Sequence, residues 1–382
     1  MRVLVAHSRY MTGPVSGENR VVDDEVRLLR EAGHEVAVYS PEPVHPDEQG
    51  PVALVRSAAR VVWSATAVRE MRRLVRGHRP DVVHLHNLVP MLSPAVIRAM
   101  DNEGVPTVMT LHNYRLFCLP ATLEREGAMC ELCVGHLPWQ GVRFGCYRGS
   151  RAASVAVGTS LGLHRTTGTF SCLRLMLPVS RFVLEVYRRA GWDPARMMVK
   201  PNFAWPVARR GGAGEYFLCA GRLSREKGVD VLLDAWSPSL GRLVVAGSGP
   251  EEARLRARAP SGVEFVGAVR PERLQELVAG ARALAVPSAS FETSGRVIIE
   301  SAAAGVPAVA SRIGAIPEVV EDGFSGLLVT PGEPGVWADA LASLTDERSR
   351  ELGEGAYRVW QDFCTPKRAL ANLEEVYGIA TR

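Results

Sequence analysis

The sequence contains very little lysine and no long apolar run. Lysine occurs only at Lys200, Lys227 and Lys367, so nearly all of the 45 basic residues are arginine. A lysine inside a glycine-containing loop is therefore conspicuous. No apolar stretch reaches the ~18–20 residues of a membrane-spanning helix, and no signal-peptide pattern precedes the first predicted strand. These absences predict a cytoplasmic protein, with at most weak peripheral contact at the inner membrane surface.

The charge balance and the cysteine content narrow the class further. A net charge of +4 is too small to indicate nucleic-acid binding. Seven cysteines without a secretory signal are typical of a reducing compartment. The apolar content of 47% and charged content of 23% are those of an ordinary globular protein, and 382 residues predict about two domains.

The first half of the chain alternates continuous apolar runs with amphipathic segments, which predicts a parallel sheet covered on both faces. The predicted strands are 3–7, 35–40, 81–87, 106–113, 175–180 and 198–202. The predicted helices are 20–32, 53–77, one from residue 93, 150–163 and 181–190.

The same alternation begins again after a linker at 203–214. Strands are predicted at 216–221, 242–247, 263–267, 281–287, 307–311 and 326–329. We therefore expect an α/β protein with two Rossmann-like, doubly wound domains facing a central cleft. Their predicted limits are 1–205, with a cysteine-rich insertion at 114–149, and 206–360. A C-terminal helix at 361–382 is predicted to pack back on the first domain.

Two glutamates eight positions apart, Glu292 and Glu300, stand where a predicted strand gives way to a helix. Backbone N–H groups at the start of that helix, near 293–296, can receive a phosphate, and the helix dipole adds about half a positive charge there. Carboxylates accept hydrogen bonds from sugar hydroxyls. The pattern therefore indicates a nucleotide sugar, although two glutamates alone are also typical of solvated loop and helix acids.

A second loop at a strand end carries the basic residues Arg222 and Lys227. Ligands of open α/β sheets bind at such positions, and an arginine and a lysine suit a phosphate group. The spacing matches neither the G-x-x-x-x-G-K-[ST] nor the G-x-G-x-x-G pattern. A solvated basic turn is the alternative.

The order of motifs resembles the retaining glycosyltransferases of family 4, which have the GT-B fold. The second half carries GRLSREKG, VVAGSGP, FVGAV, SFETSGRVIIESAAAGVPAVAS and IPEVVEDGFSGLLV in that order. The first half carries SGENRVVDDEVRLLREAGHEVAVYS, DVVHLHN and PTVMTLHNYRLFC. The resemblance thus covers nearly the whole chain, and it is most specific in the E-x7-E stretch and the basic loop.

The resemblance implies roles for individual residues. Arg222 and Lys227 would hold the donor diphosphate, Glu300 the ribose, and Glu292 the hydroxyls of the transferred sugar. The residues implied to act in catalysis are His112, Arg222, Lys227 and Glu292. The residues implied to bind the donor are Gly17, Arg222, Lys227, Val266, Gly267, Phe291, Glu292, Thr293, Ser294, Gly295 and Glu300. Asn202 is expected to line the cleft, whereas His84 and His86 are expected to be structural.

At Gly17 the sequence departs from the family, because Ser16-Gly17 stands where a Gly-Gly pair is usual. The chemistry implied is transfer of a hexosyl group from a nucleoside diphosphate sugar to a hydroxyl acceptor, with retention and without a catalytic metal. A UDP-sugar is favoured as the donor, with a GDP-mannose-dependent mannosyltransferase as the alternative. An epimerase or a non-catalytic sugar-nucleotide-binding protein is the rival from another class; the first would lack the E-x7-E pattern, and the intact set of site residues argues against the second.

Four cysteines, Cys118, Cys130, Cys133 and Cys146, lie in the insertion with the spacing C-x11-C-x2-C-x12-C. Four thiolates can close a tetrahedral zinc site, and C-x-x-C in a reducing compartment indicates metal or redox chemistry. A structural zinc, free thiols and a redox pair all remain open. The predicted helix 53–77 mixes arginine with Trp63 and Leu74, which is typical of a packed amphipathic helix or of one that docks on an anionic membrane.

Overall fold

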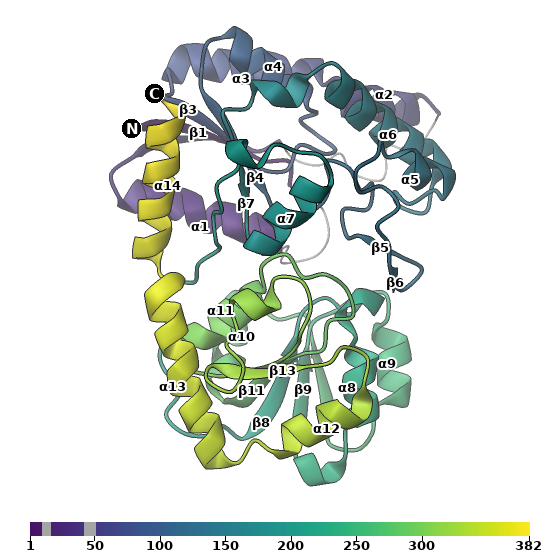
Figure 1. Cartoon of the computed structure of the whole chain (residues 1–382), viewed down its shortest axis with the longest axis vertical. Helices are drawn as coiled ribbons and strands as arrows, with labels where there is room; N and C mark the ends of the chain where they lie inside the picture. The colour runs from purple at the N-terminus through teal and green to yellow at the C-terminus, as the bar shows by residue number, and fades with distance from the viewer. Residues whose placement is uncertain (10–16, 42–50) are drawn as a thin grey trace. The chain divides into compact units, whose positions relative to one another are not determined.

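The computed structural model describes residues 1–9, 17–41 and 51–382, with side chains of helix α2 described from Arg56 onward. The chain divides into two compact units (Figure 1). The first comprises residues 1–125, 130–200 and 370–382, and the second comprises 126–129 and 201–369. No described helix is long and apolar enough to cross a membrane.

The first unit is built on a five-stranded parallel sheet of order β2-β1-β3-β4-β7. Its strands are β1 (Arg2–Ala6), β2 (Glu35–Tyr39), β3 (Val82–Leu85), β4 (Thr107–Leu111) and β7 (Leu175–Pro178). Its helices are α1 (Gly17–Glu31), α2 (Pro51–Val62), α3 (Ala65–His78), α4 (Ala95–Asn102), α5 (Trp139–Arg143), α6 (Arg151–Thr166) and α7 (Arg181–Arg189). The strand order reverses between β1 and β3, so the carboxyl ends of these strands open a crevice suited to a ligand.

The second unit is built on a six-stranded parallel sheet of order β10-β9-β8-β11-β12-β13. Its strands are β8 (Tyr216–Ala220), β9 (Leu243–Ala246), β10 (Val263–Gly267), β11 (Ala281–Val286), β12 (Ala308–Ser311) and β13 (Gly326–Val329). Its helices are α8 (Val229–Ala235), α9 (Glu252–Arg258), α10 (Pro271–Ala279), α11 (Arg296–Ala303), α12 (Pro334–Ala342) and α13 (Asp346–Phe363). In this sheet the order reverses between β8 and β11.

Both faces of the second sheet are buried, which explains its continuous apolar strands. In β8, Phe217 and Cys219 belong to the core under α8 and α12, whereas Leu218 belongs to the core under α10 and α11. Side chains of a strand point alternately to opposite faces, so a strand buried on both sides needs apolar residues at every position. The predicted pair of Rossmann-like, doubly wound domains is thereby confirmed.

The last helix, α14 (Pro366–Ala380), carries the chain from the second unit to the first. Within the first unit the hydroxyl of Tyr377 lies 2.8 Å from Nδ1 of His84 on β3. The amide of Asn372 donates to the carbonyl of Val199 at 3.3 Å. The C-terminal segment from Leu370 onward is thus part of the first unit.

Two predicted elements differ from the structure. The predicted helix 53–77 is two helices, because the chain breaks at Ser64, whose hydroxyl accepts a hydrogen bond from the Ala67 N–H and caps α3. The predicted strand 198–202 does not form. That segment makes two backbone hydrogen bonds to β7, from Met198 to Met176 and from Lys200 to Pro178, which is too little pairing for a strand.

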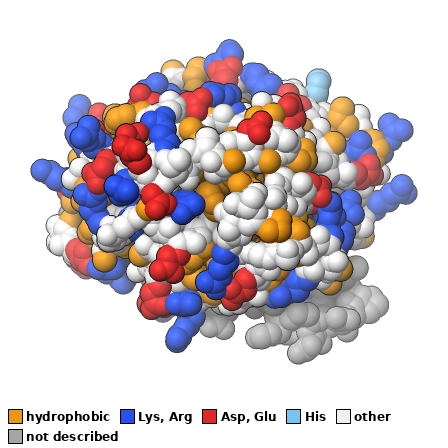
Figure 2. Space-filling model, turned by 90° about the horizontal axis from the view of Figure 1, so that it is seen from below, with side chains coloured by type: hydrophobic (Ala, Val, Ile, Leu, Met, Phe, Trp, Pro, Cys, Tyr) orange, Lys and Arg blue, Asp and Glu red, His pale blue; other side chains and the backbone are white. Residues whose placement is uncertain are grey.

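The surface carries charges of both signs. On the face shown in Figure 2, basic and acidic side chains of the described residues are intermingled and form no extended field of one sign. This distribution agrees with the low net charge of +4 and gives no footprint for a nucleic acid on that face.

Candidate functional site

The strands β8 and β11 are neighbours at the point where the order of the second sheet reverses. The loop after β8 carries Arg222 and Lys227, and the loop after β11 carries Glu292. The two loops are held in contact by their backbones, since the Ala289 N–H donates to the carbonyl of Glu226 at 2.9 Å. A Cβ on Gly228 would lie 2.0 Å from the carbonyl oxygen of Pro287, so only glycine permits this approach.

This contact brings Lys227 and Glu292 together. The Lys227 ammonium donates to Oε1 of Glu292 at 2.6 Å, and the Ser288 hydroxyl donates to the same oxygen at 2.6 Å. Burial would raise the pKa of the Glu292 carboxyl, but the Lys227 charge and the two hydrogen bonds outweigh it and lower this pKa. Glu292 is therefore a carboxylate that can accept further hydrogen bonds at neutral pH.

Arg222 lies at the start of the same loop with an exposed side chain. Its guanidinium makes no hydrogen bond or ion pair with any residue in the described part of the chain. It is therefore a guanidinium available to an anion at this edge of the sheet.

Glu300 lies in α11, the helix that follows the Glu292 loop. It accepts a hydrogen bond from Nε of Arg296 one turn earlier at 2.9 Å, and the two side chains are 17% and 13% exposed. Gly295 precedes the helix in the left-handed conformation (φ 59°). A Cβ there would come within 3.1 Å of Val319, so glycine suits both the backbone and the space.

The turn between the two glutamates is fixed from two directions. The Asn202 amide donates to the hydroxyl of Ser294 at 2.8 Å, and the Ala315 N–H donates to the carbonyl of Glu292 at 2.8 Å. Asn202 is buried, and its side-chain oxygen has no hydrogen-bond partner among the described residues. Thr293 stands in the same turn with a partly buried side chain.

The glycine loop after β9 closes the other side of the site. The Leu223 N–H donates to the carbonyl of Ser248 at 3.0 Å, and the Gly247 N–H donates to Gly267 at 2.7 Å. Val266 and Gly267 end β10 with partial exposure, and Phe291 is a partly buried side chain packed on the core that includes Val286. The loops after β8, β9, β10 and β11 thus form one connected edge.

The predicted donor residues do not all belong to this edge. Gly17 is the first residue of α1 in the first unit and is exposed. Its neighbour Ser16 and the rest of the glycine loop before it lie outside the described residues.

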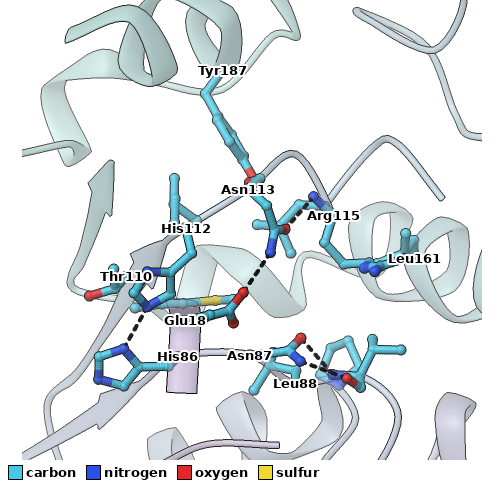
Figure 3. Close-up of a pocket in the computed structure, with 15 residues that line it drawn as sticks. Glu18, His86, Asn87, Leu88, Thr110, His112, Asn113, Arg115, Leu161 and Tyr187 are labelled. Atoms are coloured by element: carbon cyan, nitrogen blue, oxygen red, sulfur yellow. Dashed lines mark hydrogen bonds between the residues drawn. The ribbon is translucent and has the colours of Figure 1, made fainter. Parts of the chain in front are cut away.

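A small pocket lies in the first unit, at the carboxyl ends of β3 and β4 (Figure 3). His112 lines it, and its Nε2 lies 2.8 Å from Nδ1 of His86. On the other side of the pocket the Asn113 amide donates to the Glu18 carboxylate at 3.0 Å, and the Tyr187 hydroxyl donates to the Asn113 carbonyl at 2.8 Å. Figure 3 shows Asn113 directed toward Glu18 and His112 directed toward His86, so polar groups from α1 and from the ends of β3 and β4 line the pocket.

Below His112 lies a buried polar network. Glu25 is paired with Lys200, and its other oxygen lies 3.7 Å from His86 and 4.0 Å from His84. Burial above all lowers the pKa of His84 and of His86 well below the usual value, so both imidazoles are neutral. Glu25, His84 and His86 have metal-ligand spacing, but the Lys200 ammonium already supplies the positive charge. Both ring nitrogens of His84 lie within hydrogen-bond distance of a hydroxyl, on Tyr377 and on Thr110, whereas Nε2 of His86 has no hydrogen-bond partner among the described residues.

The four cysteines of the insertion also come together. Cys118, Cys130, Cys133 and Cys146 line one pocket in the first unit, together with Leu119 and Phe144 among others. None of the four forms a disulfide.

Four polar residues of these sites were not singled out from the sequence. They are Ser288 and Arg296 beside the glutamates, and Glu18 and Asn113 in the pocket of the first unit. Glu18 could have been found from its position in the first helical turn after a glycine loop, where acids are favoured. Arg296 could have been found from its i,i+4 spacing to Glu300. Ser288 has no comparable signal, since its role depends on how the loop folds.

Comparisons with known proteins identify the family of the chain. The family model described as Glycosyltransferase Family 4 matches residues 15–204, and the one described as Glycosyl transferases group 1 matches residues 214–347. The chain is 35% identical to a D-inositol 3-phosphate glycosyltransferase of Corynebacterium diphtheriae over 42% of this chain and 41% of that protein. It is 32% identical to the Acidothermus cellulolyticus protein of the same name, over 82% of this chain and 69% of that one.

Solved structures show the same architecture. HepE of Anabaena, determined in complexes with UDP, with UDP and glucose, and with UDP-glucose, superposes in its UDP complex with a TM-score of 0.67 at 17% identity. That superposition covers 99% of this chain and 100% of the other. This likeness supports the GT-B fold. With matches to family models over both halves and a relative above 30% identity across most of its length, the chain belongs to glycosyltransferase family 4.

Proposed function

We propose that the protein transfers a hexosyl group from a UDP-sugar to a hydroxyl acceptor, with retention of anomeric configuration and without a catalytic metal. The observation that carries the proposal is the contact of Lys227 with Glu292 at the reversal point of the second sheet, with Arg222 on the same loop as Lys227 and Glu300 in the helix that follows. An anion site beside two carboxylates fits a diphosphate flanked by two sugars.

The assignment of roles follows from the chemistry of each group. Arg222 and Lys227 hold the diphosphate and stabilise the charge that develops when the sugar departs. The N–H groups at the start of α11 add a positive end to the same region. These fixed cationic groups supply the neutralisation for which a divalent metal is otherwise used, which supports the metal-independent proposal.

The two glutamates separate the two sugars of the donor. Glu292 accepts hydrogen bonds from hydroxyls of the transferred hexose, while Glu300 accepts hydrogen bonds from the ribose. Val266, Gly267 and Phe291 border the base. UDP is favoured because HepE, which shares the fold, was solved with UDP and UDP-glucose. A GDP-mannose donor is the alternative.

The pocket of the first unit suits the acceptor. Glu18, Asn113 and Arg115 line it with a carboxylate, an amide and a guanidinium, which can bind hydroxyls and an anionic group. His112 offers an imidazole to a hydroxyl at the same pocket. An inositol phosphate comes first among acceptors to test, because two relatives are named for it.

Binding and product analysis test this proposal. UDP, GDP, dTDP and ADP, each with its common hexose conjugates, are titrated by thermal shift and calorimetry in the presence of EDTA. Stabilisation by UDP and a UDP-hexose supports the proposal, and stabilisation by the guanosine pair alone supports the mannosyltransferase instead. Stabilisation by none of them would refute a donor site. The anomeric configuration of the product, read by NMR, then decides between retention and inversion.

A further inference from the structure

The insertion between β4 and α6 has little regular structure of its own. It contains the two-residue strands β5 (Glu124–Arg125) and β6 (Ala128–Met129) and the five-residue helix α5. Four of its residues, Ala121, Leu123, Glu126 and Arg148, have positive φ although none is glycine. Each such residue costs about 1 kcal/mol or more. Some tight interaction must therefore hold this segment in place.

The four cysteines are placed to supply that interaction. They come from three separate turns of the insertion and line one pocket. Cys118 and Cys133 are buried, and Cys130 and Cys146 are partly exposed. The remaining cysteines, Cys172, Cys219 and Cys364, lie outside the insertion. The convergence therefore belongs to this set alone.

Backbone N–H groups are aimed at two of the sulfur atoms. Those of Ala121 and Leu123 hydrogen-bond to Cys118, and that of Gly141 hydrogen-bonds to Cys133. Gly141 can take its place only without a side chain, since a Cβ there would lie 2.8 Å from Cγ of Leu119.

We propose that Cys118, Cys130, Cys133 and Cys146 bind one structural zinc ion that cross-links the insertion. The four thiols release their protons and coordinate Zn²⁺ as thiolates at about 2.3 Å, the usual tetrahedral arrangement. No oxidant is required, so the site forms in a reducing compartment. A redox pair of Cys130 and Cys133 would leave Cys118 and Cys146 without a role in the same pocket.

The sulfur atoms must move closer when the ion binds. Among the described residues, Glu25, His84 and His86 form the group of three potential metal ligands whose ligand atoms all lie within 4.8 Å of one another. No three of the cysteine sulfur atoms of the described residues lie that close together. The proposal therefore requires changes of side-chain rotamer that bring the four sulfur atoms together when the ion binds. The tetrahedral arrangement of the sulfur atoms would thus form only when zinc binds.

The site would also stabilise one wall of the proposed acceptor pocket, a consequence that rests on the proposed function. Arg115 and Leu116 line that pocket, and Cys118 lies two positions after Leu116. The Cys118 N–H donates to the carbonyl of Tyr114 at 2.8 Å, which ties the cysteine to the start of the same turn. Loss of the ion should therefore weaken acceptor binding more than donor binding.

Metal content of the full chain, purified with reductant and without chelator, tests the zinc site directly. We expect about one zinc per chain by mass spectrometry of the metal. Cys118→Ser, Cys130→Ser, Cys133→Ser and Cys146→Ser should each lose most of it, whereas Cys172→Ser, which changes a partly exposed cysteine outside the insertion, should retain it. Equal zinc in all five variants would overturn the proposal.

Cobalt spectroscopy of the wild-type chain covers the case in which the serine variants fail to fold. Zinc-free protein titrated with Co²⁺ should develop the thiolate charge-transfer and ligand-field bands of a tetrahedral four-sulfur site, saturating at about one equivalent. Absence of these bands, or mapping of a disulfide between Cys130 and Cys133 under reducing purification, would refute the zinc site. Neither result bears on UDP binding, so the proposed function is tested separately.

Discussion

Replacing Glu292 by glutamine isolates the role of its charge, because the change keeps the side chain's size. In the structure this carboxylate accepts hydrogen bonds from Lys227 and Ser288, both at 2.6 Å. The amide oxygen of glutamine can still accept from the serine hydroxyl. It cannot balance the lysine charge or accept as strongly from a sugar hydroxyl.

The expected effect differs between the parts of the donor. A hydrogen bond to a charged group contributes about 1.5–3 kcal/mol, and 1.4 kcal/mol is a factor of ten. If Glu292 contacts the transferred hexose, kcat/KM for the UDP-hexose should fall by about 10- to 150-fold. Binding of UDP, which has no hexose, should stay the same or tighten, because Lys227 loses its internal anion and becomes fully available to the diphosphate.

Parallel kinetics and calorimetry on the wild-type chain, Glu292→Gln and Glu264→Gln measure this difference. Glu264 is half-exposed on β10 and pairs with Arg242 at the surface, so its variant should change either quantity by less than about two-fold. If Glu292→Gln retains kcat/KM within that range, or if UDP and UDP-hexose binding weaken equally, the assignment of Glu292 to the hexose is refuted.

Three further changes test other parts of the structure. Lys227→Ala should weaken UDP binding by about 10- to 150-fold in calorimetry, because a charge-assisted hydrogen bond is lost. Arg254→Ala, which changes an exposed residue on α9, should leave UDP binding unchanged. Equal effects of the two changes would contradict the assignment of Lys227. Gly295→Ala should lower the free energy of unfolding by about 1–2 kcal/mol in urea because its φ is 59° and Val319 is near, whereas Gly212→Ala, which meets open space, should not. Burial lowers the pKa of His7 to about 4. Between about pH 6.5 and pH 4 this imidazole is therefore protonated in the unfolded chain and neutral in the folded unit. The free energy of unfolding should therefore fall on acidification below pH 6.5, by about 2 kcal/mol at pH 5 from His7 alone. In His7→Gln the midpoint of urea unfolding should depend less on pH between pH 7.5 and pH 5. An unchanged pH dependence would contradict this account.

The strand pattern was readable from the sequence because both sheets are buried on both faces. A strand such as Tyr216–Ala220 must then be apolar at nearly every position, and glycine or a polar loop marks its end. The break at Ser64 was missed because the apolar period runs on across it from α2 into α3. Whether residues 198–202 form a strand depends on how many residues of β7 are available to pair with them. The local sequence pattern does not contain this information.

The site residues were predicted individually, but their pairing was not. Lys227 and Glu292 are 65 positions apart, and they meet because β8 and β11 are adjacent in the sheet. Asn202 and Ser294 are 92 positions apart and meet across the same unit. Strand order is set by packing of the whole unit. Analysis of one sequence segment at a time can therefore predict which loops carry reactive side chains, but not which of these side chains contact each other.

Glu292 and Glu300 each pair with a basic side chain, and this pairing affects how the proposed donor would bind. Glu292 holds Lys227, and Glu300 holds Arg296, so two of the cations near the site are already neutralised. Arg222 is exposed and makes no ion pair within the described residues, so it is the guanidinium that an arriving diphosphate would meet first. On the proposed function, we expect the diphosphate to draw Lys227 from Glu292, which would release the carboxylate to accept the hexose hydroxyls. A nucleoside diphosphate without its sugar would break the Lys227–Glu292 pair and leave that carboxylate with the Ser288 hydroxyl but without a sugar hydroxyl. We therefore expect the site to bind the intact donor more tightly than the product diphosphate.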